Sequence, residues 1–136
     1  MLEALYYHSA HNPRYIDELH TALACGADMA VFAPEDVQPG ALEGVDLSPL
    51  AGRVALAVPA VLTAEALDGL NAWAKARPFE ITFLSNVGQL GLEWPGEKTG
   101  DNMLNIGNDL SVAQLRDWGL GAYTPSVELN AGQINA

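Results

Sequence analysis

The sequence predicts an α/β fold of parallel βα repeats, forming part of a TIM-like (β/α) barrel. Short apolar runs alternate with segments whose apolar residues recur at helical spacing. Four runs begin near residues 54, 79, 103 and 120, at intervals of 25, 24 and 17 residues, which is the size of a βα unit. The 136 residues suit one domain, so we expect residues 1–136 to form a single partial barrel.

The first part of the chain contains two predicted strands, at residues 4–7 and 29–33. A helix lies between them, and its apolar residues share one face: Ile16, Leu19 and Leu23. Asn12 and Pro13 are suited to begin this helix, and Gly26 is suited to end it. The Pro-, Gly- and acid-rich residues up to 52 then predict a loop with at most one short helix.

The second part is more regular. Its predicted strands are residues 54–58, 79–84, 103–106 and 120–124. Thr63 is the predicted N-cap of one helix, and Ser111 with Gln114 has the spacing of a capping box for another. Trp73 and Trp118, at helical spacing with leucines, are predicted to lie in the core.

Charge and cysteine content exclude several classes of function. The chain carries 17 acidic and 6 basic residues, a net charge of −11, and the basic residues never cluster. Nucleic-acid binding depends on Lys and Arg at phosphates, so we expect no direct nucleic-acid or anionic-membrane binding. The single cysteine, Cys25, excludes an internal disulfide and is predicted to be packed. No targeting or membrane-spanning segment is visible, so we expect a cytoplasmic protein.

Two architectures fit the repeat: an open doubly wound sheet and part of a (β/α)8 barrel. The sequence has no glycine-rich phosphate loop after any predicted strand, which removes support for the nucleotide-binding sheets. Asn130 and Gln133 are spaced as the start of a helix close to the last residue. We therefore expect a fragment whose partner is the remainder of the barrel or a second copy of the chain.

Polar residues follow the predicted strands, at the edge where parallel α/β folds bind ligands. After the later strands these residues are Ser85, Asn86, Asn105, Asn108, Ser126 and Glu128. Asn105 is predicted to be a buried amide within a strand, and Asp101 with Glu128 is a candidate carboxylate pair. Each residue also has a structural interpretation: Asn108 is a candidate helix cap, and Ser85–Asn86 a candidate turn.

A metal site is not expected in this chain. His8 and His11 follow the first predicted strand and His20 lies in the next helix, but their spacing is not that of a helical zinc pair. A Ser–His–Asp arrangement lacks the G-x-S-x-G elbow that would support it.

Four segments resemble the collagenase-like peptidase family U-32, in the C-terminal half of its barrel. They are Val-Ala-Leu-Ala-Val-Pro (54–59), Phe-Leu-Ser-Asn-Val-Gly-Gln-Leu (83–90), Gly-Asp-Asn-Met-Leu-Asn-Ile-Gly-Asn (100–108) and Tyr-Thr-Pro-Ser-Val-Glu-Leu-Asn (123–130). The third and fourth, in this order and spacing, are the most specific. Residues 53–136 carry the family-like repeats, and residues 1–52 match only as a general βα unit.

The resemblance implies a TIM-like barrel and one of two kinds of chemistry. Members of the family are labelled peptidases or take part in hydroxylation of RNA or of ubiquinone precursors, and several hold an iron–sulfur cluster. It implies catalytic roles for Glu128 and Asp101, and ligand-binding roles for Asn86, Asn105, Asn108 and Ser126. The cluster cysteines lie outside this stretch, so no cofactor is expected within the chain and a cluster only in a longer parent protein.

Two functions follow from the sequence. The first is a U-32-like barrel enzyme, of which this chain is an inactive part on its own. The alternative is a non-catalytic α/β module that binds a partner protein or a small polar ligand.

Overall fold

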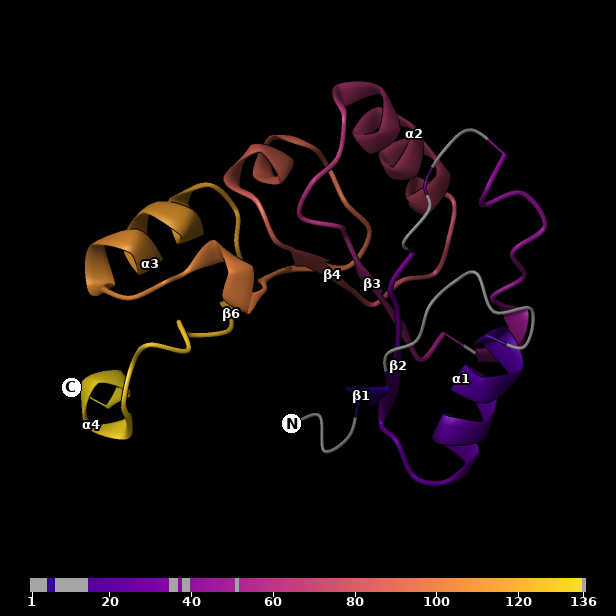
Figure 1. Ribbon diagram of the computed structural model, residues 1–136, viewed down its shortest axis with the longest axis horizontal. Helices are drawn as coiled ribbons and strands as arrows, with labels where there is room; N and C mark the ends of the chain where they lie inside the picture. The colour runs from indigo at the N-terminus through magenta and orange to yellow at the C-terminus, as the bar shows by residue number, and fades with distance from the viewer. Residues whose placement is uncertain (1–4, 7–14, 35–36, 38–39, 51, 136) are drawn as a thin grey trace.

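The computed structural model describes residues 5–6, 15–34, 37, 40–50 and 52–135. They form one parallel sheet with helices between its strands (Figure 1). The strands are β1 (Leu5–Tyr6), β2 (Met29–Phe32), β3 (Val54–Ala57), β4 (Ile81–Leu84), β5 (Glu97–Gly100) and β6 (Ala122–Tyr123). The helices are α1 (Tyr15–Ala24), α2 (Ala64–Lys75), α3 (Asp109–Asp117) and α4 (Ala131–Ile134), and the 3-10 turns are η1 (Ser48–Leu50), η2 (Val87–Gly91) and η3 (Asn102–Leu104).

The sheet follows the order of the chain, from β1 through to β6, and every neighbouring pair is parallel. A doubly wound sheet reverses its strand order at a switch point, and this sheet does not. Right-handed crossovers in such an order place the connecting helices on one face. Figure 1 shows α1, α2 and α3 around the outside of a curved sheet, and the described strands leave it open. The parallel βα fold is therefore confirmed. None of the described helices is long and apolar enough to cross a bilayer.

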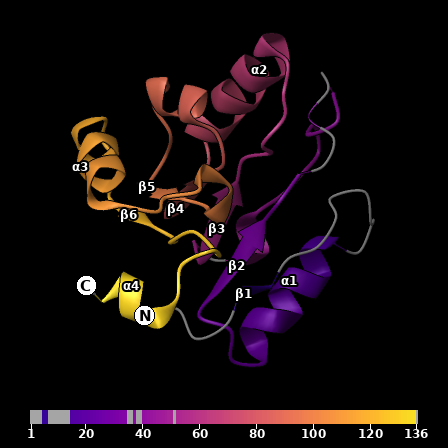
Figure 2. The ribbon, with the colours of Figure 1, turned by 60° about the vertical axis from the view of Figure 1, so that its left-hand side comes forward.

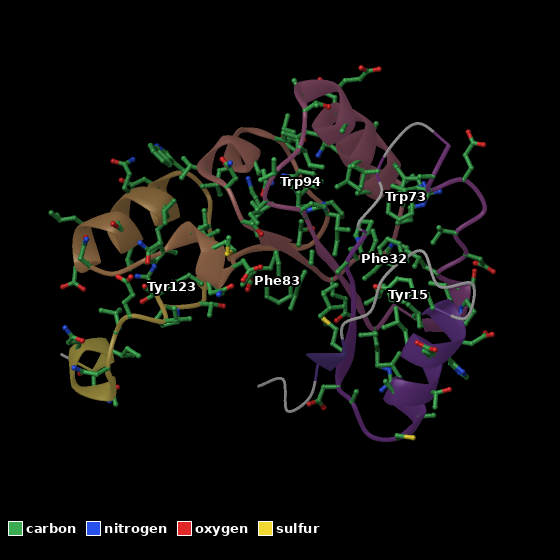
Figure 3. All side chains as sticks on the ribbon, in the orientation of Figure 1. Tyr15, Phe32, Trp73, Phe83, Trp94 and Tyr123 are labelled. Carbon is green, nitrogen blue, oxygen red and sulfur yellow. The ribbon has the colours of Figure 1, made fainter. Side chains whose placement is uncertain are left out.

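Side chains alternate between the two faces of the sheet. Toward the helices, Phe32, Leu56 and Leu84 are fully buried in the larger core. On the inner face, Met29, Val31 and Ala55 form a smaller cluster against which Ala57, Ile81 and Phe83 pack. Figure 3 shows Phe83 on the inner side of the sheet and Tyr15, Phe32 and Trp73 on the helix side. Across β2, β3 and β4 the inner face is thus apolar, as in the interior of a barrel.

The fifth strand differs from the prediction. Residues 103–106 are not a strand: Met103 lies in η3, Asn105 has a left-handed backbone with φ 51°, and Ile106 makes one isolated parallel bridge to Pro125. The strand is Glu97–Gly100, whose residues Glu-Lys-Thr-Gly contain no apolar run. A Cβ at Gly100 would lie within 3.0–3.2 Å of Leu104, Leu120 and Ile106, so those side chains fill its place.

Several helix signals are confirmed. Thr63 caps α2, its hydroxyl accepting the Ala66 N–H at 3.2 Å. Gly26 follows α1 at a φ of 109°, a conformation that suits glycine. Asn130 and Gln133 form the expected capping box of α4. The predicted caps Asn12 and Pro13 lie outside the described residues.

Three local predictions are wrong. The N-cap of α3 is Asn108 rather than Ser111, because the Asn108 Oδ1 accepts the Ser111 N–H at 2.9 Å. Trp118, the C-cap residue of α3, is 50% exposed rather than in the core. Cys25 is also exposed, since it follows the last residue of α1.

Candidate functional site

A group of polar residues follows β4, β5 and β6 at one edge of the sheet. We call these residues the polar edge: Ser85, Asp101, Asn105 and Ser126. Because the strands are parallel and adjacent, their carboxyl ends meet at the same edge (Figure 2). This is the edge at which barrels of this kind place their ligand-binding loops.

Ser85 is held in place by its backbone and its hydroxyl. Its N–H donates to the Gln89 Oε1 at 2.9 Å. The Ser85 Oγ lies 3.1 Å from the Val58 carbonyl oxygen and 3.4 Å from the Asp101 Oδ2. A hydroxyl has one proton and two acceptor lone pairs, so Ser85 donates to one of these oxygens at a time. The contact with Asp101 joins the ends of β4 and β5.

Asp101 is the half-buried carboxylate of the polar edge. Its backbone N–H donates to the Leu84 carbonyl at 2.8 Å, which fixes the turn directly after β5. Its Oδ1 accepts the Asn102 N–H at 2.5 Å and so caps η3. The Oδ2 faces the Ser85 hydroxyl and keeps lone pairs that can accept a hydrogen bond from a substrate hydroxyl or amine.

Asn105 and Ser126 join the ends of β5 and β6. The buried Ser126 hydroxyl donates to the Asn105 Oδ1 at 2.5 Å, and the Ser126 N–H donates to the Ile106 carbonyl at 2.9 Å. Asn105 is exposed rather than buried in a strand, because the left-handed turn after η3 carries it out of the sheet. Its amide nitrogen donates no hydrogen bond within the described ranges, so it remains available to a ligand.

The other three predicted residues stand apart from this group. Asn86 and Asn108 are exposed, and their side-chain oxygens cap η2 and α3. Asn108 also borders a space of about 50 Å³ between α3 and α4, too small for more than a water or two. Glu128 is exposed, and its backbone N–H donates to the Ser126 Oγ at 3.3 Å. The carboxylate pair of Glu128 and Asp101 stays a prediction, since the hydrogen bonds of the described residues connect Asp101 to Ser85 and the Glu128 backbone to Ser126.

Gln89, which was not among the residues predicted from the sequence, holds the segment after β4 in place through hydrogen bonds. Gln89 is 3% exposed, and its Oε1 accepts the backbone N–H groups of Ser85 and Asn86 at 2.9 and 3.2 Å. Its Nε2 donates to the Pro59 carbonyl at 2.7 Å, which links the ends of β3 and β4. The buried Trp94 donates its Nε1–H to the Gln89 carbonyl at 2.8 Å. The Asn86-x-x-Gln89 spacing, that of a capping box, is the signal that could have identified it.

The described residues contain no group of three or more His, Cys, Asp or Glu side chains that could hold a metal ion. His8 and His11 lie outside the described residues. An iron–sulfur cluster requires several cysteine ligands, and the one cysteine of this chain lies at the end of α1, so these residues do not fit such a cluster.

Comparisons with protein-family models, with curated proteins and with solved structures found no match to this chain.

Proposed function

We propose that this chain forms part of a U-32-like barrel, and that its polar edge binds the substrate at the mouth of that barrel. The observation that carries the proposal is the juxtaposition of the two most specific resembling segments, 100–108 and 123–130. Gly100 pairs with Tyr123, Ile106 bridges to Pro125, and Asn105 is bonded to Ser126. The residues that carry the resemblance therefore belong to one structural unit.

The sheet supports the barrel part of the proposal. Its strands are parallel and in chain order, and its inner face is apolar across β2, β3 and β4. Ile81 and Phe83 on this face are only partly buried by the described residues. The remaining strands of a barrel, supplied by further residues or by another chain, would cover them.

The polar edge supports a substrate with hydroxyl or amide groups. Asp101 offers an acceptor oxygen, and Asn105 offers donor hydrogens, at the two ends of the η3 turn that follows β5. Among the chemistries of the family we favour hydroxylation over peptide hydrolysis, because the sequence has no G-x-S-x-G elbow and the described residues contain no group of three or more metal-ligating side chains to support a hydrolytic mechanism. We expect the chain to be inactive alone, since the strands described leave the barrel open.

The proposal is tested by titrating the ¹⁵N-labelled chain with uridine, an uncharged RNA nucleoside that carries hydroxyl groups, and, separately, with a gelatin-derived peptide. We expect one of them to shift the amide resonances of Asp101, Asn105 and Ser126 saturably. Asp101→Asn should weaken that binding about tenfold, because asparagine keeps the cap of η3 but removes the charge. Asp109→Asn, at an exposed carboxylate in the first turn of α3, is the matched control and should have no effect.

Absence of any shift at the polar edge, or equal effects of the two variants, would contradict the proposal. A gelatin-cleavage assay separates the two chemistries, and strong cleavage by this chain alone would overturn the preference for hydroxylation.

The alternative function is a non-catalytic module whose apolar inner face binds a partner protein. The partial exposure of Ile81 and Phe83 favours it. Light scattering after size-exclusion chromatography tests both the barrel proposal and this alternative, because in each of them another polypeptide covers the inner face. A stable monomer at high concentration would count against coverage by a second copy.

A further inference from the structure

The most exposed apolar side chains of the described residues lie at the same end of the sheet as the polar edge. Four of them are 62–91% exposed, and we call these residues the apolar rim: Val61, Met103, Leu110 and Val127. Val61, Met103 and Val127 lie in the segments that follow β3, β5 and β6, and Leu110 lies in the first turn of α3, directly after the segment that follows β5. The other exposed large apolar side chains that the structure describes are at most 50% exposed. Apolar exposure is therefore greatest at the carboxyl ends of the strands.

Hydrogen bonds between the loops hold the backbone of the apolar rim in place. The Gln89 Nε2 donates to the Pro59 carbonyl at 2.7 Å, which ties the segment after β4 to the segment after β3. The Ser126 hydroxyl donates to the Asn105 Oδ1 at 2.5 Å, which ties the segment after β6 to the segment after β5. A surface that is already held in one conformation loses less conformational entropy when a partner binds, so these bonds favour docking at the rim.

The charges around the apolar rim are all of one sign. The segments that follow β3, β4, β5 and β6 contain no lysine or arginine in their sequence, and they are residues 58–63, 85–91, 101–108 and 124–130. The carboxylates in these segments and in the first turns of the helices that follow them are those of Glu65, Asp101, Asp109 and Glu128. A nucleic acid or an anionic membrane is repelled by such a surface, whereas a positively charged protein segment is attracted to it.

We propose that the apolar rim docks a basic amphipathic segment of another protein, in which apolar side chains alternate with lysine or arginine. The apolar side chains of the segment cover Met103 and Val127, and its positive charges face the exposed carboxylates of Asp109 and Glu128. Isolated exposed apolar residues are ordinary on protein surfaces, but a group of them at one end of a sheet, among charges of one sign, is typical of a protein-binding surface. The proposal does not depend on the substrate proposed for the polar edge.

The probes are three synthetic peptides of equal length. The first has leucines at helical spacing and lysines elsewhere, the second has serine in place of leucine, and the third has glutamate in place of lysine. We expect the leucine–lysine peptide to shift the amide resonances of Met103, Leu110 and Val127 saturably, and to bind at least about tenfold more tightly than either of the others. Because the chain has a net charge of −11, the serine–lysine peptide measures the attraction that arises from net charge alone.

Variants at exposed positions separate the apolar rim from the rest of the surface. Met103→Ser combined with Val127→Ser should weaken binding of the leucine–lysine peptide about tenfold, and Val61→Ser, at the most exposed of the four residues, is a second and independent test. Glu128→Gln should weaken binding and reduce its dependence on salt. Trp118→Ser is the matched control and should leave binding unchanged, because Trp118 is an exposed apolar residue at the far end of α3 from the rim.

The proposal is overturned if the serine–lysine or the leucine–glutamate peptide binds as tightly as the leucine–lysine peptide, because charge alone or apolar contact alone would then explain the binding. Equal effects of the rim variants and of Trp118→Ser would also overturn it. Sedimentation of the chain with phosphatidylcholine vesicles, lost in the variant that combines Met103→Ser with Val127→Ser, would assign the rim to a lipid surface instead. None of these results depends on ligand binding at the polar edge.

Discussion

Gln89→Ala should destabilise the fold more than any other single substitution of an uncharged polar residue near the polar edge. The Gln89 side chain makes three hydrogen bonds, two as an acceptor from Ser85 and Asn86 and one as a donor to Pro59. It is 3% exposed, so its removal also leaves a cavity.

The magnitude follows from these contacts. Each hydrogen bond contributes about 0.5–1.5 kcal/mol net, and a lost buried methylene costs about 0.8 kcal/mol. Asn86 is exposed, so water can accept the hydrogen bond that its N–H loses, which reduces the cost of the substitution. We therefore expect the free energy of unfolding to fall by about 2–4 kcal/mol.

Urea unfolding monitored by circular dichroism measures this change, provided that the dependence on urea is the same for both proteins. Gln114→Ala is the matched control, because Gln114 is exposed on α3, and it should change stability by less than about 0.5 kcal/mol. A Gln89→Ala variant as stable as the control would refute the structural role assigned to Gln89.

Three further predictions concern other parts of the fold. Gly96→Ala should lower the free energy of unfolding in urea by at least about 2 kcal/mol, because φ is 70° and the new Cβ would lie 2.2 Å from the Glu80 carbonyl oxygen. The control Gly44→Ala, with φ 80° and no heavy atom near the new Cβ, should lower it by about 1 kcal/mol. Equal losses of stability in the two variants would contradict the clash at Gly96. Hydrogen bonds from the Ser48 hydroxyl and, to a smaller extent, from the Ser48 N–H lower the pKa of Asp46. The Asp46 carboxylate therefore stabilises the fold at pH values above its ordinary pKa, and this contribution is lost as the pH falls through the pKa of the folded state. Ser48→Ala should raise the Asp46 pKa in an NMR titration, and an unchanged pKa would be evidence against this interaction. Trp118→Phe should remove most of the acrylamide-quenchable tryptophan fluorescence, since Trp118 is 50% exposed and Trp94 is 7% exposed; a similar loss from Trp94→Phe would contradict that difference.

The strands that could be predicted are those whose own residues are apolar. β2, β3 and β4 carry side chains that pack on both faces of the sheet, so the apolar runs identify them. β5 reads Glu-Lys-Thr-Gly and could not be identified in this way, because its helix-side core position is a glycine covered by residues from later in the chain. Leu104 and Ile106 pack against Gly100, so the segment 103–106 is apolar for that reason and its sequence resembles that of a strand.

Part of the candidate site followed from the topology. Residues after parallel strands gather at one edge, which is why Asp101, Asn105 and Ser126 could be predicted together. The environment of Asn105 could not, because it depends on a left-handed turn after η3. The bonds of Gln89 to Ser85 and Asn86 are local and follow from the capping-box spacing, but its bond to Pro59, 30 residues earlier, could not be predicted because only the folded chain brings these two residues together.

The central claim, that the ends of β5 and β6 form one polar edge, is tested most directly by a double-mutant cycle on Asn105 and Ser126. Asn105→Gly and Ser126→Ala are the single changes, and glycine is chosen because φ at Asn105 is 51°. If the Ser126 hydroxyl donates to the Asn105 Oδ1 in solution, urea unfolding should give a coupling energy of about 0.5–1.5 kcal/mol. Additive effects of the two changes, with no coupling, would contradict the claim.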